Sequence, residues 1–384
     1  MTVFSTRTPA DLRPNRISVA RGAGMPVLDL TVSNPTHCGL PYPSDFLAPL
    51  GDPAGLAYRP DPRGLMGARK AVSGELVRLG AVVPPERILL TASTSEAYAF
   101  LFKLLCDPGE MVLAPVPSYP LFEHLARVEG VRALPYHLDG DHGWRLDLHE
   151  LAAAPAGVKA VIAVHPNNPT GSHLHPEDAW AVQELCASRG WGFIVDEVFL
   201  DFPLAEIGRS LAGGQTCLTF SLGGLSKSVG LPQLKLGWIA ASGPEGLVTE
   251  ALERLEVIAD TFLSVATPVQ LALPVLLERG EIVRRAILDR CRQNLAVLRE
   301  LAGGLPALEV LVPGGGWSGV LRYPAVVDEE DLVLSLLVDG VAVQPGFFFD
   351  FPRDGYLVLS LLPEPPIFRE GVARLLSRLS ACCG

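Results

Sequence analysis

Short apolar runs alternate with helical stretches over residues 88–240, and this alternation is the main structural signal in the sequence. The runs predict strands at 88–90, 112–114, 158–164, 192–196, 218–221 and 236–240. Stretches with helical spacing predict intervening helices at 96–105, 121–128 and 176–188. A strand that is apolar throughout, such as 158–164, is typical of a parallel sheet covered on both faces. The pattern therefore predicts an α/β fold with an open, mostly parallel sheet.

The chain outside this region has a different pattern, which predicts a smaller α+β domain. Further helices are expected at 65–79, 246–262, 269–278, 281–301, 329–338 and 367–380. Further strands are expected at 27–32, 308–312, 318–323, 340–344 and 355–361. The rest of residues 1–45 is expected to form an extended arm. We therefore assign residues 45–280 to a large domain, and residues 1–44 with 281–384 to the small one.

Composition narrows the classes of function that remain. The 384 residues are 48% hydrophobic and 19% charged, enough apolar content for a large core. The net charge of −11 has no long runs, which argues against binding to nucleic acid or to an anionic membrane. No apolar run could cross a bilayer, and the N-terminus lacks a signal-peptide pattern. The seven scattered cysteines lack metal-ligand spacing, so we expect no metal site and a cytoplasmic location.

The stretch TFSLGGLSKSVGLPQLKLGW, residues 219–238, contains the first candidate for chemistry, Lys227. Its glycines leave the backbone open to a closely packed ligand. An amine held among Gly, Leu and Val is desolvated, which lowers its pKa and favours a nucleophile that can form a Schiff base. The alternative is a solvated lysine in a glycine-rich loop, because most lysines lie at the surface.

A second candidate site is the segment ASTS, residues 92–95, between a predicted strand and a predicted helix. The hydroxyls of Ser93, Thr94 and Ser95, with the backbone N–H groups of a helix N-terminus, suit a phosphate. The alternative is capping alone, because Ser and Thr cap many helices.

Two polar residues follow buried strands, where open α/β sheets bind their ligands. HPNNPTG, residues 165–171, comes directly after a predicted strand, and Asn168 in it can donate to a phenolic oxygen. Asp196 closes the strand of FIVDEVF, where a buried carboxylate needs a partner. A protonated pyridine nitrogen would be such a partner. A helix cap or an arginine pair is the alternative for Asp196.

The ordered set NNPTG, VDEVF and LSK, with a second lysine eight residues after the first, resembles the class I/II aminotransferases. These enzymes depend on pyridoxal 5′-phosphate and have the aspartate-aminotransferase fold. The resemblance covers roughly residues 25–380. It implies fold type I, in which the large domain is an α/β/α sandwich beside a smaller α+β domain.

The resemblance also implies residue roles. Lys227 corresponds to the lysine that forms the Schiff base and shuttles the proton, Asp196 to the partner of the pyridine nitrogen, and Asn168 to the donor to the ring hydroxyl. Thr94 and Ser95, with Ser93 beside them, fall where the family binds the phosphate.

Two tyrosines match positions on the cofactor's periphery. Tyr119, in PVPSYP, matches the aromatic residue that stacks on the ring, although an ordinary core tyrosine is the alternative. Tyr58, in YRPDPRG, matches a tyrosine that reaches the phosphate in the neighbouring subunit. The resemblance therefore implies a homodimer with shared active sites.

Three departures from the family pattern concern the cofactor. Lys235 stands where most relatives have an arginine on the phosphate, and it lacks the bidentate fork. Gly224 replaces a serine that also binds the phosphate. Phe199 replaces a tyrosine that donates to the ring hydroxyl. We expect somewhat weaker phosphate binding and one donor fewer on the ring oxygen.

The fourth departure concerns the substrate. Val358, in GYLVLS, occupies the place of the arginine that binds the substrate carboxylate. Either another cation replaces it, with Arg322, Arg59 and Arg63 as candidates, or the recognised group is not an α-carboxylate. The run Phe347, Phe348 and Phe349 suggests an apolar wall near the site, and a core role is the alternative.

The expected function is amino-group transfer from an amino acid or amine to a keto acid, by a ping-pong mechanism through a Schiff base on Lys227. A lyase, decarboxylase or racemase on the same fold is the first alternative, because Val358 changes how the substrate would be oriented. A non-catalytic binding protein is the second, and Lys227, Asp196 and Asn168 argue against it.

Phe199 generates a spectral prediction. Because it cannot donate to the ring oxygen, the anionic form of that oxygen is less stabilised, and the Schiff base should have a higher pKa than is usual in the family. A visible-absorbance titration of the holoenzyme measures that pKa. An unprotonated Schiff base at neutral pH would contradict the prediction.

Overall fold

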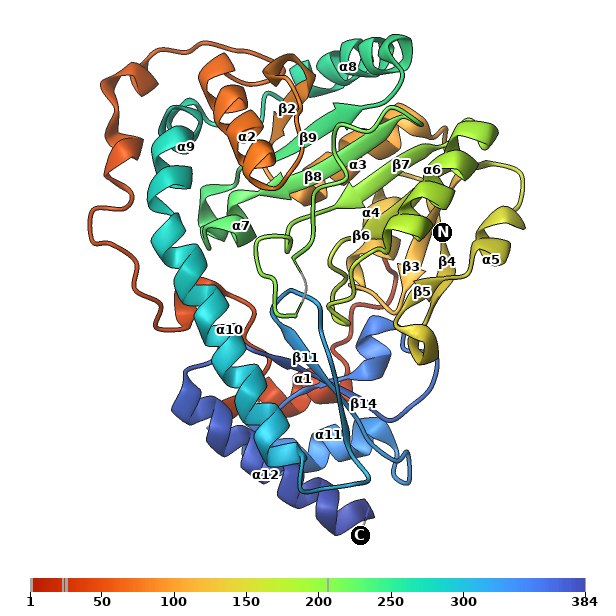
Figure 1. The fold of residues 1–384 in the computed structure, drawn as a ribbon, viewed down its shortest axis with the longest axis vertical. Helices are drawn as coiled ribbons and strands as arrows, with labels where there is room; N and C mark the ends of the chain where they lie inside the picture. The colour runs from red at the N-terminus through yellow and green to blue at the C-terminus, as the bar shows by residue number, and fades with distance from the viewer. Residues whose placement is uncertain (1–2, 23, 25–26, 206, 384) are drawn as a thin grey trace.

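A sheet of eight strands forms the centre of the larger part of the chain (Figure 1). The computed structural model describes residues 3–22, 24, 27–205 and 207–383. The strand order is β2 (Ile88–Thr91), β9 (Gly237–Ser242), β8 (Thr219–Gly224), β7 (Gly192–Asp196), β6 (Val158–Val164), β3 (Met111–Val116), β4 (Arg132–Asp139) and β5 (Arg145–Leu146). In this sheet β9 and β5 run against the other strands, which are parallel.

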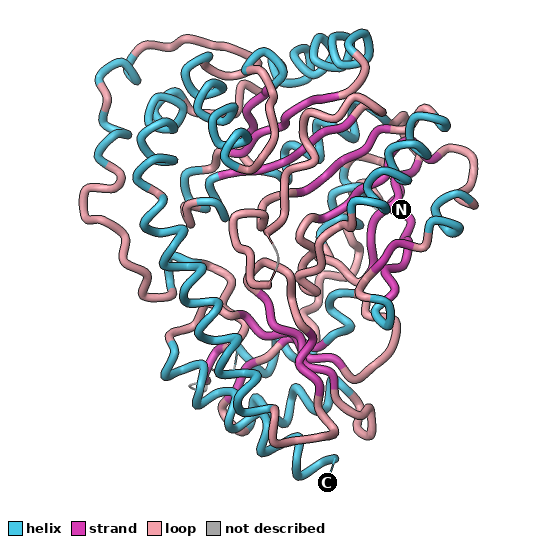
Figure 2. Tube along the Cα trace, viewed as in Figure 1, coloured by secondary structure: helices cyan, strands magenta, loops and turns pink. Residues whose placement is uncertain are grey.

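Helices cover both faces of this sheet, as Figure 2 shows. One face packs on α3 (Thr94–Leu105), α4 (Leu121–Val128) and α8 (Glu245–Asp260). The other face packs on α5 (Leu148–Ala152), α6 (Pro176–Arg189), α2 (Met66–Arg78) and α9 (Thr267–Arg279). The predicted α/β/α sandwich is therefore confirmed, because strands such as β6 and β7 alternate their side chains between two apolar layers.

The C-terminal part builds a smaller α+β unit, which lies below the large sheet in Figure 1. Its antiparallel sheet has the order β10 (Glu309–Leu311), β11 (Ser318–Arg322), β14 (Tyr356–Ser360) and β13 (Gln344–Pro345). β1 (Leu28–Asp29) pairs in parallel with β12 (Val341–Ala342). The helices of this unit are α10 (Glu281–Ala302), α11 (Glu329–Val338) and α12 (Pro365–Cys383). The long α10 begins beside the large sheet and ends against α12.

Several sequence predictions are wrong in detail. The predicted extended arm contains α1 (Arg16–Gly22), which packs on α11, and Arg16 pairs with Glu330 and Asp331. The strand predicted at 340–344 is two strands, because β12 pairs with β1 and β13 with β14. β4 was not predicted, because its Pro135 and alternating polar residues disguise a strand. Tertiary contacts decide each of these elements.

The remaining helices are short. In the part of the chain that the structure describes, seven are single turns of 3-10 helix, at Pro35–His37, Ala48–Gly51, Pro53–Leu56, Pro85–Arg87, Gly140–His142, Pro232–Leu234 and Gly346–Phe349. The last is α7 (Leu225–Ser228), which follows β8 directly and carries Lys227. Within the described ranges, none of the helices is long and apolar enough to span a membrane.

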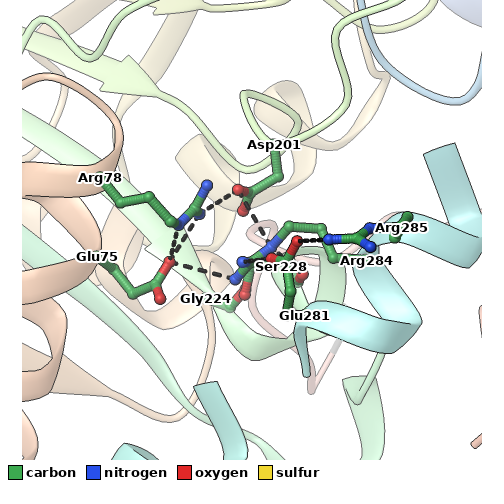
Figure 3. A network of polar contacts seen from close by, with 8 residues as sticks. All are labelled: Glu75, Arg78, Asp201, Gly224, Ser228, Glu281, Arg284 and Arg285. Carbon is green, nitrogen blue, oxygen red and sulfur yellow. Dashed lines mark hydrogen bonds and ion pairs between the residues drawn. The ribbon is translucent and has the colours of Figure 1, made fainter. Parts of the chain in front are cut away.

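A buried arginine holds α7 in place (Figure 3). Arg284, near the start of α10, donates from Nε to the carbonyl oxygen of Ser228 at 3.1 Å. It also pairs with Glu75 at 3.2 Å, with Asp201 at 3.3 Å and with Glu281 at 2.9 Å. The guanidinium thereby joins α2, α7 and α10 behind the lysine.

Replacing Arg284 tests this anchor. Arg284→Met should lower the free energy of unfolding by about 1–3 kcal/mol, because it removes the bond to the Ser228 carbonyl and leaves Arg78 as the remaining counter-charge of Glu75 and Asp201. Arg285→Met is the matched control, since the Arg285 side chain is 71% exposed against 7% for Arg284, and should cost under about 0.5 kcal/mol. Urea unfolding measures both. Equal losses in the two variants would contradict the prediction.

Candidate active site

Asn168, Asp196 and Lys227 lie at one edge of the large sheet. Asn168 follows β6, Asp196 is the last residue of β7, and Lys227 follows β8 on α7. These three strands are parallel neighbours, so their carboxyl ends meet at the same edge. The structure thus brings together the three residues to which the sequence assigned the chemistry.

The amine of Lys227 is enclosed by aromatic rings. Its Nζ lies 4.9 Å from the ring centroid of Trp317 and 5.4 Å from that of Phe199. It has no hydrogen-bond acceptor in the described part of the chain. Burial lowers the pKa of Lys227 to about 8, against the opposing attraction of the Asp196 carboxylate. A desolvated amine was predicted from the residues around Lys227, whereas its contact with Trp317 was not predicted.

Asp196 is buried and tied to the large domain by two hydrogen bonds. Its Oδ2 accepts from the Tyr98 hydroxyl at 3.0 Å, and its Oδ1 from the Val198 N–H at 3.1 Å. Burial raises the pKa of Asp196 to about 6, while these donors and Lys227 act in the opposite direction. No arginine pairs with it among the described residues. Tyr98, one turn into α3, was not singled out, because in the sequence it is one more aromatic residue on an apolar helix face.

Asn168 and its neighbour Asn167 divide two tasks. Asn167 donates to the Pro117 carbonyl at 3.0 Å and to Thr170 Oγ1 at 2.9 Å, so it fixes the loop after β6. Asn168 Oδ1 accepts from the hydroxyl of Ser318 on β11 at 3.2 Å. That bond leaves the Nδ2 donors of Asn168 for a ligand. Ser318 was not predicted, because only the tertiary fold brings β11 to this loop.

The N-terminus of α3 approaches the same edge through glycines. Ser93 is the N-cap and its Oγ accepts from the Glu96 N–H at 3.2 Å, so this hydroxyl is used in capping. The N–H groups of Thr94 and Ser95 fall in the first turn, where a helix supplies no acceptors. A Cβ on Gly237 would lie 3.1 Å from Thr94 N, so β9 and α3 meet here without side chains between them.

The peripheral candidates are dispersed. Lys235 is exposed in a left-handed conformation, φ 50°, two residues before Gly237, and it has no partner among the described residues. Tyr119 is 48% exposed and follows Ser118, whose N–H donates to the Phe349 carbonyl at 2.9 Å. Tyr58 is 79% exposed and lines a cavity together with Arg59, Ser264 and Gln270.

The position of Val358 is apolar. Val358 is 1% exposed and packs with Val320, Phe349, Phe351 and Tyr356. The candidate replacement cations are arranged as follows: Arg322 pairs with Glu309, Arg63 with Glu256 at 2.6 Å, and Arg59 is exposed. Of the predicted aromatic wall, Phe349 is buried in this cluster, Phe348 packs on its edge and Phe347 is partly exposed.

These residues fit pyridoxal phosphate, the cofactor that the resemblance implies. The amine of Lys227 is buried without an acceptor, as expected for a group that bonds a carbonyl carbon. Asp196 is a buried acid that can accept from a ring N–H. Gly224 ends β8 and Gly237 begins β9, and a Cβ on either would lie within 3.1 Å of neighbouring backbone. The first-turn N–H groups of α3 at this junction are suited to a phosphate. No group of three or more metal-ligating side chains was found in the described ranges.

Comparisons with known proteins agree with this geometry. The chain is 28% identical to the alanine aminotransferase of Mycobacterium tuberculosis over 373 residues, 92% of this chain and 85% of that one. It is 32% identical to the S-alkyl-thiohydroximate lyase SUR1 of Arabidopsis thaliana over 236 residues, 59% of this chain and 50% of that one. An aminotransferase structure from Escherichia coli superposes with a TM-score of 0.85 at 23% identity, over 100% of both chains, which shows a common fold.

A family model also matches most of the chain. The family model described as aminotransferase class I and II matches residues 55–363, which include every residue of the edge described above. The chain therefore belongs to the class I and II aminotransferases, enzymes that depend on pyridoxal phosphate.

Proposed function

We propose that Lys227, Asp196 and Asn168 are the residues through which this aminotransferase transfers an amino group, in two half-reactions, from a donor to a keto-acid acceptor. The observation that carries the proposal is the buried, acceptor-free amine of Lys227 beside the Asp196 carboxylate, at the carboxyl ends of adjacent strands. Such a pair of perturbed groups in one place is typical of an active site.

Lys227 performs the proton transfers in this proposal. Bound pyridoxal phosphate supplies the carbonyl carbon that takes up the amino group and a ring that accepts the electron pair from the donor carbon. With a pKa near 8, Lys227 Nζ is partly neutral at physiological pH and can take the proton from the donor carbon and return it one bond away. The rings of Trp317 and Phe199 lie over the amine and cover part of it.

Asp196 and Asn168 orient and polarise in this proposal. Asp196 accepts a ring N–H, and a cationic partner at that position would keep the carboxylate ionised despite its burial. Tyr98 and Val198 already fix the two carboxylate oxygens. Asn168 donates from Nδ2 to the ring oxygen, while its Oδ1 is held by Ser318.

We assign the phosphate to the N-terminus of α3, with Thr94, Ser95 and the capping residue Ser93. The exposed Lys235 is two residues before Gly237, which meets the backbone of Thr94, and we assign it to the same phosphate. Tyr119 would stack on the ring. We also propose a homodimer in which Tyr58 reaches the partner's phosphate, and its 79% exposure supports this.

We also propose a cytoplasmic location and a division into two domains. The cysteines 38, 106, 186, 217, 291 and 382 are free thiols, which supports the cytoplasm, a reducing compartment. The division into 45–280 on one side and 1–44 with 281–384 on the other is supported by β1, which pairs with β12, and by α10, which starts at Glu281.

A lyase outcome is the second candidate, and one observation favours it. The similarity to the thiohydroximate lyase SUR1 extends over more than half of this chain. In a lyase the same residues would expel a leaving group from the donor, and the aminated cofactor would not accumulate. Accumulation of the aminated cofactor with an amino donor, followed by its loss with a keto acid, distinguishes transfer from elimination.

Lys227→Ala tests the catalytic assignment. Turnover should fall by at least about 10²–10⁴-fold, because no other described amine at this edge can move the proton. The matched control is Lys70→Ala, an exposed lysine on α2, which should keep wild-type turnover. Thermal unfolding would verify that both variants fold. Substantial turnover in Lys227→Ala would mean that another residue is the catalytic base.

The pKa of Lys227 predicts a pH dependence. Only a neutral amine attacks a carbonyl, so the rate at which apoprotein captures pyridoxal phosphate should rise with pH and level off above about 8. An ordinary lysine, with a pKa of 10.5, would give a rate that still rises through pH 9. Stopped-flow absorbance measures the capture, with Lys227→Arg as the control that should show none. A rate that keeps rising beyond pH 9 would contradict the lowered pKa.

A further inference from the structure

One face of the small sheet is directed at the proposed site. Ser318 on β11 donates to Asn168, so the face that carries Ser318 looks toward the ring-binding edge. Side chains alternate along a strand, so Val320 and Arg322 share this face with Ser318. Val358, on β14, pairs directly with Val320 of β11. Paired residues share a face, so Val358 lies on the same face as Ser318.

This face is apolar where it leaves Ser318. Val320 and Val358 are buried against Phe349, Phe351 and Tyr356, and Trp144 from the large domain packs on the same cluster. Phe349 is in turn bonded through its carbonyl to Ser118, and Ser118 Oγ to Asn167. The cluster is thus fixed to the loop that carries Asn168. An anionic group placed against it would lose its hydration without gaining a partner.

The cations on this face are already neutralised. Arg322, two residues beyond Val320, pairs with Glu309 and lies 3.7 Å from Asp141. Arg353 lies 3.5 Å from the same Asp141. The polar residue opposite Val358 is Gln344, which is neutral. A substrate carboxylate at Val358 would therefore face valines and phenylalanines on this side.

The cavity beside Tyr119 has the same character. It has a volume of about 520 Å³, and Tyr119, Phe347 and Phe348 line it together with the carboxylates of Glu123 and Asp350. No Arg or Lys lines it in the described part of the chain. Burial and the nearby Glu123 raise the pKa of Asp350. Phe122, His124 and His137 also line this cavity. Its two acids and its aromatic rings favour a cationic, apolar molecule over an anion.

The aromatic rings at Lys227 also favour a cation over an anion. The faces of Trp317 and Phe199 lie over an ammonium group, and aromatic faces attract cations because their quadrupole is negative at the face. An incoming ammonium suits this pocket, whereas a carboxylate on the adjacent carbon would approach negative ring faces.

We propose that the amino donor is a primary amine with an apolar body and no carboxylate on the amino-bearing carbon. The keto-acid acceptor, which occupies the same place in the second half-reaction, then carries its carboxylate away from the carbonyl carbon. This inference rests on the proposed function of the same site. It names the class of donor. The apolar cluster at Val358 and the rings of Trp317 and Phe199 select that class.

The test uses the wild-type holoenzyme and matched donors. The pairs are ethylamine with L-alanine, 3-methylbutylamine with L-leucine, and 2-phenylethylamine with L-phenylalanine. Loss of the visible absorbance of the cofactor in a single turnover follows the donor half-reaction by itself, and spectral titration gives each dissociation constant. For each apolar pair the amine should bind about 10–100-fold more tightly than its amino acid, the range expected for burying an unpaired polar group.

The possible results of this comparison distinguish failure of the inference from failure of the proposed amino-group transfer. If amines and amino acids both leave the cofactor absorbance unchanged, the proposed function fails. If the amino acids bind and react and their amines do not, the function stands and the inference is overturned. If Arg59→Ala removes such a preference for amino acids, a cation from the partner subunit binds the carboxylate, and the inference is likewise overturned.

A substitution at Val358 tests the role of the apolar cluster directly. Val358→Arg introduces a cation at the apolar position and should move the preference toward the amino acid by at least tenfold, while Val358→Leu, the control for size, should keep the preference for the amine. If a folded Val358→Arg variant keeps the wild-type ratio of the two dissociation constants, amine and amino acid, the apolar cluster at Val358 does not select the donor. If that variant does not fold, the wild-type ratios decide alone.

Discussion

The amine of Lys227 sits in a pocket of aromatic rings, with the carboxylate of Asp196 as its counter-charge, and much of the structure serves this arrangement. Removing an ammonium from water is costly, so its pKa falls and the neutral, nucleophilic form becomes accessible. Burial also raises the pKa of Asp196, and the donors Tyr98 and Val198 oppose that rise. Neither group would have this chemistry at a solvated surface.

Holding such a pair requires a rigid frame behind it. Parallel strands bring β7 and β8 to one edge, and Arg284 ties the short helix α7 to α2 and α10 through buried ion pairs (Figure 3). On the other side, Gly224 and Gly237 let β8, β9 and the N-terminus of α3 come within backbone contact. The lysine and the phosphate-binding candidate are therefore positioned by the same crowded junction.

The small domain contributes differently. Ser318 reaches Asn168, and the next residues on that face are Val320 and Val358, packed under an aromatic cluster. The fold is shared with aminotransferases at TM-scores near 0.85, yet a fold does not define which donor fits. In our proposal, donor selection depends on a few side chains on this face, and here Val320 and Val358 are apolar.

Much of this could be anticipated from residues alone. Continuous apolar runs give parallel strands, and their order with NNPTG, VDEVF and LSK indicated the fold, the cofactor and the three central residues, because such patterns are local. The helix α1, the split of 340–344 into β12 and β13, and the strand β4 were missed, since each exists only through a partner elsewhere in the chain.

At the site, too, the sequence determined what depends on local pattern, and the tertiary structure decided what depends on distant partners. The sequence alone determined that Lys227, Asp196 and Asn168 would lie at one sheet edge and that Val358 could not bind an anion. Only the tertiary structure decided that Tyr98 holds Asp196, that Trp317 covers Lys227, that Ser318 orients Asn168 and that Arg284 anchors α7. These contacts join residues tens to hundreds of positions apart, and no local pattern of hydrophobicity or spacing encodes which distant side chain will fill a given place.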